Sequence, residues 1–162
     1  MSPRAAARLA SLGFTQVYDY VAGEADWLAF GLPTEGTSAD APRAGHLASP
    51  DVPICQRTDR LGNVRDQVRA RGWDQCIVVD EHRVVLGRVR GDAFDGDPDL
   101  TAEVVMEVGP ATVRPSEPLD ALTKRMRDRY VGSIVVSTSD GVLVGVLRRE
   151  DAERRLDELD KR

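Results

Sequence analysis

The chain has 162 residues, of which 41% are apolar and 30% charged, with a formal net charge of −5. This is the composition of a soluble protein with one core, and no apolar run approaches the ~20 residues that a membrane helix needs. The acidic balance argues against a nucleic-acid partner, and the N-terminus lacks the apolar core of a signal peptide, so we expect a cytoplasmic protein without a membrane partner.

Residues 1–36 predict a short appendage of helix, strand and helix. An Ala-rich stretch from Ser2 to Leu12 predicts the first helix, residues 15–18 the strand and residues 24–28 the second helix. We expect the apolar side chains of this region to pack on the rest of the protein or on a partner chain, because together they would form an adhesive patch. Residues 37–50 are dominated by Thr, Ser, Ala, Pro and Gly and predict a linker.

From residue 51 onward the sequence is a repeat. Residues 54–94 and 112–152 are one pattern written twice, 58 positions apart and without a gap. Leu61 corresponds to Leu119, Gly87 to Gly145 and Arg90 to Arg148. Self-similarity at a fixed period predicts two copies of one unit, each covering the apolar face of the other. We therefore expect one copy at 51–104, a second at 105–162, and a ligand-binding groove between them.

Each copy predicts the element order β-α-β-β-α. The first strand falls at 54–56 or 112–114, and Thr58 or Ser116 can cap the helix that follows. That helix carries an apolar stripe at i, i+3 and i+7, which is Leu61, Val64 and Val68 in the first copy and Leu119, Leu122 and Met126 in the second. Two further strands form a hairpin, and in the second copy a charged helix runs from Arg149 to about Leu159. The fold class is α+β, with the copies related by a pseudo-twofold axis.

The two cysteines and two histidines indicate no metal or disulfide chemistry. Cys55 and Cys76 lie in predicted strands among apolar neighbours, where a free cysteine behaves as a small buried hydrophobe. His46 and His82 have no partner at a spacing that ligates a metal.

The second copy resembles a CBS domain, the cystathionine beta-synthase regulatory module. The resemblance rests on residues 105–115, the strand 134–136, the Ser-Asp-Gly turn, the strand 143–147 and Asp151. It extends over roughly residues 45–160 as a tandem pair. The resemblance implies a compact pair that often dimerises into a disc and binds AMP, ADP, ATP or S-adenosylmethionine in the cleft between the repeats. It also implies a regulatory homodimer without catalytic residues, metal or required cofactor.

The resemblance places the candidate ligand site in the second copy. The family signature has an Asp six residues after a strand Gly, and Gly145 and Asp151 satisfy it. A carboxylate there accepts hydrogen bonds from both ribose hydroxyls, although Asp151 equally stabilises the first turn of its own helix. Arg148 stands where the family has Thr or Ser; it either clamps phosphate, fills the pocket or reaches solvent. The predicted set of ligand-binding residues is Asp151, Arg148, Thr112, Val113, Ser133 and Ile134.

The first copy departs from the signature, because Ala93 occupies the position that corresponds to Asp151. We therefore expect at most one standard nucleoside site. Two functions stay open: a sensor that passes ligand binding to an unidentified target protein, and a dimerisation or scaffold module with a degenerate pocket.

Residues 6–33 resemble the end of a rhodanese domain. The catalytic Cys of such a domain lies in a loop before the helix that contains residues 5–7, and this sequence has no Cys there. Without that thiolate a persulfide cannot form, so no sulfurtransferase activity is expected.

Overall fold

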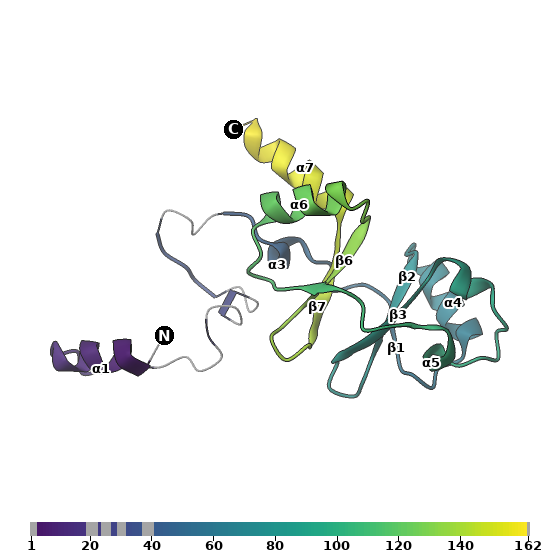
Figure 1. Ribbon diagram of the computed structural model, residues 1–162, viewed down its shortest axis with the longest axis horizontal. Helices are drawn as coiled ribbons and strands as arrows, with labels where there is room; N and C mark the ends of the chain where they lie inside the picture. The colour runs from purple at the N-terminus through teal and green to yellow at the C-terminus, as the bar shows by residue number, and fades with distance from the viewer. Residues whose placement is uncertain (1–2, 19–22, 24–26, 29–31, 37–40, 162) are drawn as a thin grey trace.

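Two small sheets form the centre of the protein. The computed structural model describes residues 3–18, 23, 27–28, 32–36 and 41–161. One sheet has the strand order β1 (Ile54–Cys55), β2 (Gln75–Val79), β3 (Val85–Arg90) and β4 (Glu107–Val108); the other has β5 (Thr112–Val113), β6 (Ser133–Ser137) and β7 (Leu143–Arg148). In each sheet the first strand is parallel to the second and the third is antiparallel to it (Figure 1). The predicted α+β repeat is confirmed.

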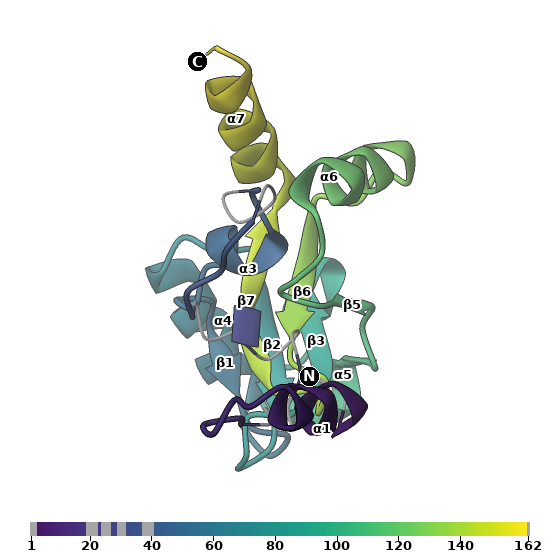
Figure 2. The same cartoon turned by 90° about the vertical axis from the view of Figure 1, so that its left-hand side faces the viewer.

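The principal helices bury the stripes that the sequence predicts. Helix α4 (Leu61–Ala70) covers the first sheet and α6 (Leu119–Asp128) the second, each with three apolar side chains at most 4% exposed. The predicted charged helix is α7 (Arg149–Asp160), which packs with α6 beyond the ends of β6 and β7 (Figures 1 and 2). In the first copy only a 3-10 turn, η1 (Gly91–Asp95), takes its place. Among the described helices, none combines the length and apolar character needed to cross a membrane.

Two short helices, each lying just before the first strand of a repeat, pack on the sheet of the other repeat. Helix α3 (Ala44–Leu47) precedes the first copy but packs on the second sheet, and α5 (Ala102–Val105), 58 positions later, packs on the first. The same backbone hydrogen bond holds each at 2.9 Å, from Ala44 N–H to the Glu117 carbonyl and from Ala102 N–H to the Asp59 carbonyl. Residues 44–47, predicted as part of a linker, are therefore a structural element of the repeat.

A third apolar cluster joins the two sheets. Its buried members come from both copies and from the segment before β1: Val52, Ile77, Val79, Val135, Leu143 and Val146. Residues 58 positions apart meet directly along the axis, where Gln75 Nε2 donates to Ser133 Oγ at 2.8 Å and Val84 bridges Val142. Each fully buried aliphatic side chain here contributes about 1.5–3 kcal/mol, so the two copies are one cooperative unit.

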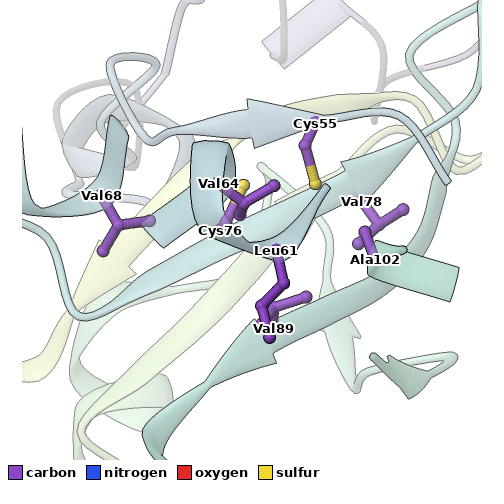
Figure 3. Packing of buried hydrophobic residues seen from close by; sticks show 8 residues of the cluster. All are labelled: Cys55, Leu61, Val64, Val68, Cys76, Val78, Val89 and Ala102. Atoms are coloured by element: carbon purple, nitrogen blue, oxygen red, sulfur yellow. The ribbon is translucent and has the colours of Figure 1, made fainter. Parts of the chain in front are cut away.

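The two cysteines occupy aliphatic positions of the core. Cys55 and Cys76 are free and buried (Figure 3), and they correspond to Val113 and Ile134 in the second copy. A hydrogen bond with the Cys55 thiol, together with burial, raises the pKa of the Cys76 thiol well above its ordinary value. A protonated, buried thiol is a poor nucleophile, which agrees with the hydrophobic role predicted for both.

The N-terminal appendage matches its prediction only in part. Helix α1 (Pro3–Ser11) is present, and Trp27 and Leu28 are helical; the rest of the predicted second helix lies outside the described residues. The strand predicted at 15–18 is wrong, because no described strand lies alongside to accept its hydrogen bonds. Helix α1 stands apart from both sheets (Figure 1), and Leu12, Phe14 and Tyr18 are 58–80% exposed. Phe14 and Tyr18 therefore do not pack on the repeat pair, whereas Leu28 is only 6% exposed. That the exposed side chains pack on a partner chain stays a prediction.

The close approach of the exchanged segments can be tested at two equivalent glycines. A Cβ at Gly145 would lie 2.5 Å from the Ser49 carbonyl oxygen, which is backbone, whereas at Gly87 it would first meet the flexible end of the Met106 side chain. Gly145→Ala is therefore expected to lose about 2–3 kcal/mol of unfolding free energy and Gly87→Ala about 1 kcal/mol. Urea denaturation of both variants measures this. Equal losses would contradict a rigid backbone contact at Gly145.

Candidate functional site: two pockets between the copies

Two cavities open where the copies meet. The first, of about 440 Å³, is the Trp73 pocket, lined by Gly72, Trp73, Asp74, Gln75, Arg90, Gly132, Ser133, Arg148 and Glu150. The second, of about 370 Å³, is the Arg88 pocket. Its lining is Arg88, Arg90, Glu107, Ala111, Arg125, Met126, Arg129, Tyr130, Val131, Gly132, Ser133 and Ile134. Both volumes lie in the range of small-ligand sites.

The two pockets adjoin but differ in their relation to the pseudo-twofold axis. The Trp73 pocket contains both members of three equivalent pairs, Asp74 and Gly132, Gln75 and Ser133, and Arg90 and Arg148, so it lies on the axis. The register agrees, because it pairs Gln75 with Arg90 and Ser133 with Arg148. The Arg88 pocket lies to one side of the axis and shares Arg90, Gly132 and Ser133 with the first.

In the Trp73 pocket an arginine lies over an aromatic ring. The Arg148 guanidinium carbon is 3.9 Å from the centroid of the Trp73 ring, and Arg148 Nη2 reaches the Gly72 carbonyl oxygen at 3.5 Å. The first contact is a cation–π interaction worth about 0.5–1 kcal/mol when exposed; the second is at the limit of a hydrogen bond. Of the three roles open for Arg148 from the sequence, this geometry corresponds to partial filling of the pocket.

The same pocket contains a buried acceptor without a partner. Gln75 is 1% exposed and its Nε2 donates to Ser133, but its Oε1 accepts no hydrogen bond from any described residue. An unsatisfied buried acceptor costs about 1–3 kcal/mol. Because this oxygen has almost no accessible surface, a ligand would pair with it only after the Gln75 side chain turns toward the cavity.

The Arg88 pocket is dominated by arginine. Arg88 is 8% exposed, and its Nη2 donates to Glu107 Oε2 at 2.9 Å. The same oxygen lies 3.3 Å from Arg90 Nε. The hydrogen bond from Arg88, and then the charges of both arginines, lower the pKa of the Glu107 carboxyl from its ordinary value of 4.5. Glu107 is therefore an anion shared by two cations.

The structure divides the predicted site residues between the two pockets. Arg148 and Ser133 line the Trp73 pocket, whereas Ser133 and Ile134 line the Arg88 pocket. Thr112 and Val113 line neither, although the preceding Ala111 lines the Arg88 pocket. Asp151 also lines neither; it follows Glu150 in the first turn of α7 and pairs with Arg154.

Sequence reasoning missed Trp73, Gln75 and Arg88. Each stands where the two copies differ, opposite Val131, Ser133 and Val146. Comparing the copies for their differences, rather than for their shared pattern, would have identified all three. Among the described residues no three His, Cys, Asp or Glu side chains gather as metal ligands would.

The ion pair at Glu107 predicts a pH dependence of stability. Because the folded-state pKa is lowered, this carboxylate stabilises the protein above its unfolded pKa near 4.5, and the contribution is lost as the pH falls through the folded value. The difference in unfolding free energy between the wild type and Glu107→Gln should be largest at neutral pH and shrink on acidification to about pH 3. Urea titrations at several pH values measure it. A difference that stays constant would contradict the assignment of the ion pair.

Known proteins resemble this chain in the region of the repeat. The CBS domain family model matches residues 102–158, while none of the curated protein sequences matches the chain. The CBS domains of a transcriptional regulator from Streptococcus pneumoniae are 27% identical (TM-score 0.65, 71% of this chain and 99% of that one).

Two further solved structures share the fold at lower identity. One is the cytosolic domain of the Mg2+ channel MgtE in complex with ATP (20% identity, TM-score 0.64, 72% of this chain), of which the present chain spans half. The other is CBSX2 from Arabidopsis thaliana in complex with AMP (15% identity, TM-score 0.65, 73% of this chain and 98% of that one). The matched residues and the shared fold together support a CBS domain pair, with the family match on the second copy and the exchanged segment before it.

Proposed function

We propose that the repeat pair is a non-enzymatic regulatory module that binds an adenosyl ligand, such as AMP, ADP, ATP or S-adenosylmethionine, in the Trp73 pocket. The observation that carries the proposal is the meeting of an aromatic face, an arginine and an unsatisfied buried acceptor in one cavity between the copies. The ATP and AMP complexes of similarly folded proteins support this class of ligand.

The ligand would replace Arg148 on the indole ring. An adenine base stacks on an aromatic face with a gain of about 1–3 kcal/mol, which exceeds the cation–π contact that it displaces. The released guanidinium then lies at the same pocket and can hold a phosphate with two parallel N–H donors. The alternatives of filling the pocket and clamping phosphate are thus two states of one side chain.

Two other side chains would complete recognition. Gln75 Oε1 would accept a hydrogen bond from the exocyclic amine of adenine. Asp151 would accept the ribose hydroxyls after leaving Arg154; the two side chains are 40% and 68% exposed, and exposed pairs of this kind are worth at most about 1 kcal/mol. In this proposal Thr112, Val113 and Ile134 support the sheet around the pocket.

Regulation would follow from the position of the ligand between the copies. A ligand that contacts both binds one relative arrangement better than others and so shifts the population toward it. The Gln75–Ser133 hydrogen bond joins the two copies in the wall of the pocket, so it would change when their relative arrangement changes. In this proposal the module is a cytoplasmic homodimer that passes the change to an unidentified target protein.

The second candidate function is a dimerisation or scaffold module. The specific observation in its favour is the Trp73–Arg148 contact, which occupies part of the pocket. If this contact is permanent, the pocket is degenerate and the repeat pair acts only through its surfaces.

Thermal unfolding with AMP, ADP, ATP and S-adenosylmethionine distinguishes the two functions. A ligand that binds only the folded state adds about 2.7 kcal/mol of stability at a hundredfold excess over Kd. We expect one ligand to raise the unfolding midpoint of the wild type and of Asp157→Ala, an exposed acidic position on the same helix, but not of Asp151→Ala. Ligand-induced shifts are compared within each variant, because removing a first-turn Asp itself costs about 0.3–1 kcal/mol. If no ligand at millimolar concentration raises the unfolding midpoint of the wild type, the sensor function is wrong and the scaffold function remains.

A further inference from the structure

The charges of the Arg88 pocket are not required by the fold. The residue that corresponds to Arg88 in the second copy is Val146, which is 1% exposed and packs in the cluster between the sheets. The position therefore accepts an aliphatic side chain, and a buried guanidinium there costs several kcal/mol of desolvation unless it is well paired. Glu107 and Arg125 likewise correspond to the uncharged Ser49 and Gln67.

The pairing of Arg88 is incomplete. Its only hydrogen-bond partner among the described residues is Glu107, and its Nε, although buried, has none there. Glu107 is shared with Arg90, so one carboxylate faces two guanidinium groups. The pocket thus holds a buried donor and an excess of positive charge next to an open cavity.

The remaining lining adds to this excess. Arg125 pairs with Glu117 at 2.9 Å, while Arg129 has no carboxylate partner within the described part of the chain. Four arginines and a single carboxylate line about 370 Å³. Guanidinium groups match phosphate oxygens with two parallel hydrogen bonds, so the complementary ligand is a compact anion with two or more negative charges.

The pocket lacks the carboxylate that holds a ribose. Ala93 occupies the position equivalent to Asp151, so no carboxylate is available there for ribose hydroxyls. Val131 stands at the position of Trp73, and the aromatic residue of the lining, Tyr130, is 92% exposed. We propose that the Arg88 pocket is a second binding site, specific for a small phosphate-type polyanion without a nucleoside, and separate from the adenosyl site in the Trp73 pocket.

Isothermal titration calorimetry of the full chain with inorganic pyrophosphate tests the proposal. We expect Arg88→Val, which introduces the residue found at the equivalent position 146, to weaken binding at least tenfold. The matched control is Arg69→Ala, an exposed arginine on α4 outside both pockets, which should bind as the wild type does. Because Arg88 is buried, thermal unfolding of each variant confirms folding. Arg129→Ala, an exposed residue of the rim, is the second variant and should weaken binding about threefold.

Competition separates this site from the adenosyl site. Adenosine, which has no phosphate, should not displace pyrophosphate, and Asp151→Ala should bind pyrophosphate normally whether or not it binds nucleotides. Failure of the wild type to bind pyrophosphate at millimolar concentration would overturn the proposal, as would equal affinity in Arg88→Val and Arg129→Ala. Displacement by adenosine would place the anion in the Trp73 pocket and overturn it too.

Discussion

The exchange of short helices between the copies is the constraint on which the rest of the structure depends. A sheet of three or four short strands cannot bury both faces by itself, and here each sheet is completed by the segment that precedes the other copy. Ala44 and Ala102 make this contact with equivalent hydrogen bonds, and both are fully buried. Neither copy can therefore form its complete core without the other, which fixes the two sheets relative to each other and the pockets between them.

The chemistry of the two pockets is decided by a few side chains that differ between the copies. An aromatic ring faces the first pocket at Trp73, and its counterpart is Val131; a guanidinium faces the second at Arg88, and its counterpart is Val146. Duplication thus supplies an internal reference for each side chain. A charged or aromatic residue whose counterpart only packs is therefore a candidate for a role beyond packing, and this comparison requires no other sequence.

Most of the fold could be predicted because apolar periodicity determines which face of a helix is buried. Helix α3 could not be predicted, because a segment of four residues that includes Gly45 is too short to show an apolar periodicity. Its role is evident only from its hydrogen bonds to residues far along the chain. The candidate site was also harder to predict, because its residues are far apart in the sequence. Each pocket combines the strand ends of one copy with residues of the other, so Arg148 lies against Gly72 and Trp73 rather than beside Thr112. Sequence reasoning had grouped residues of a single copy.

Arg90 connects the two pockets physically. It lines both, and it shares Glu107 with the buried Arg88. An anion that attracts Arg90 toward the Trp73 pocket would leave Glu107 to Arg88 alone and reduce the excess positive charge of the second pocket. Binding at one pocket then alters affinity at the other, and by thermodynamic linkage the effect must be reciprocal. In the two proposals made above, adjoining sites that share Arg90 would let the repeat pair respond to two kinds of anion together, with the selectivity of each set by side chains that differ between the copies.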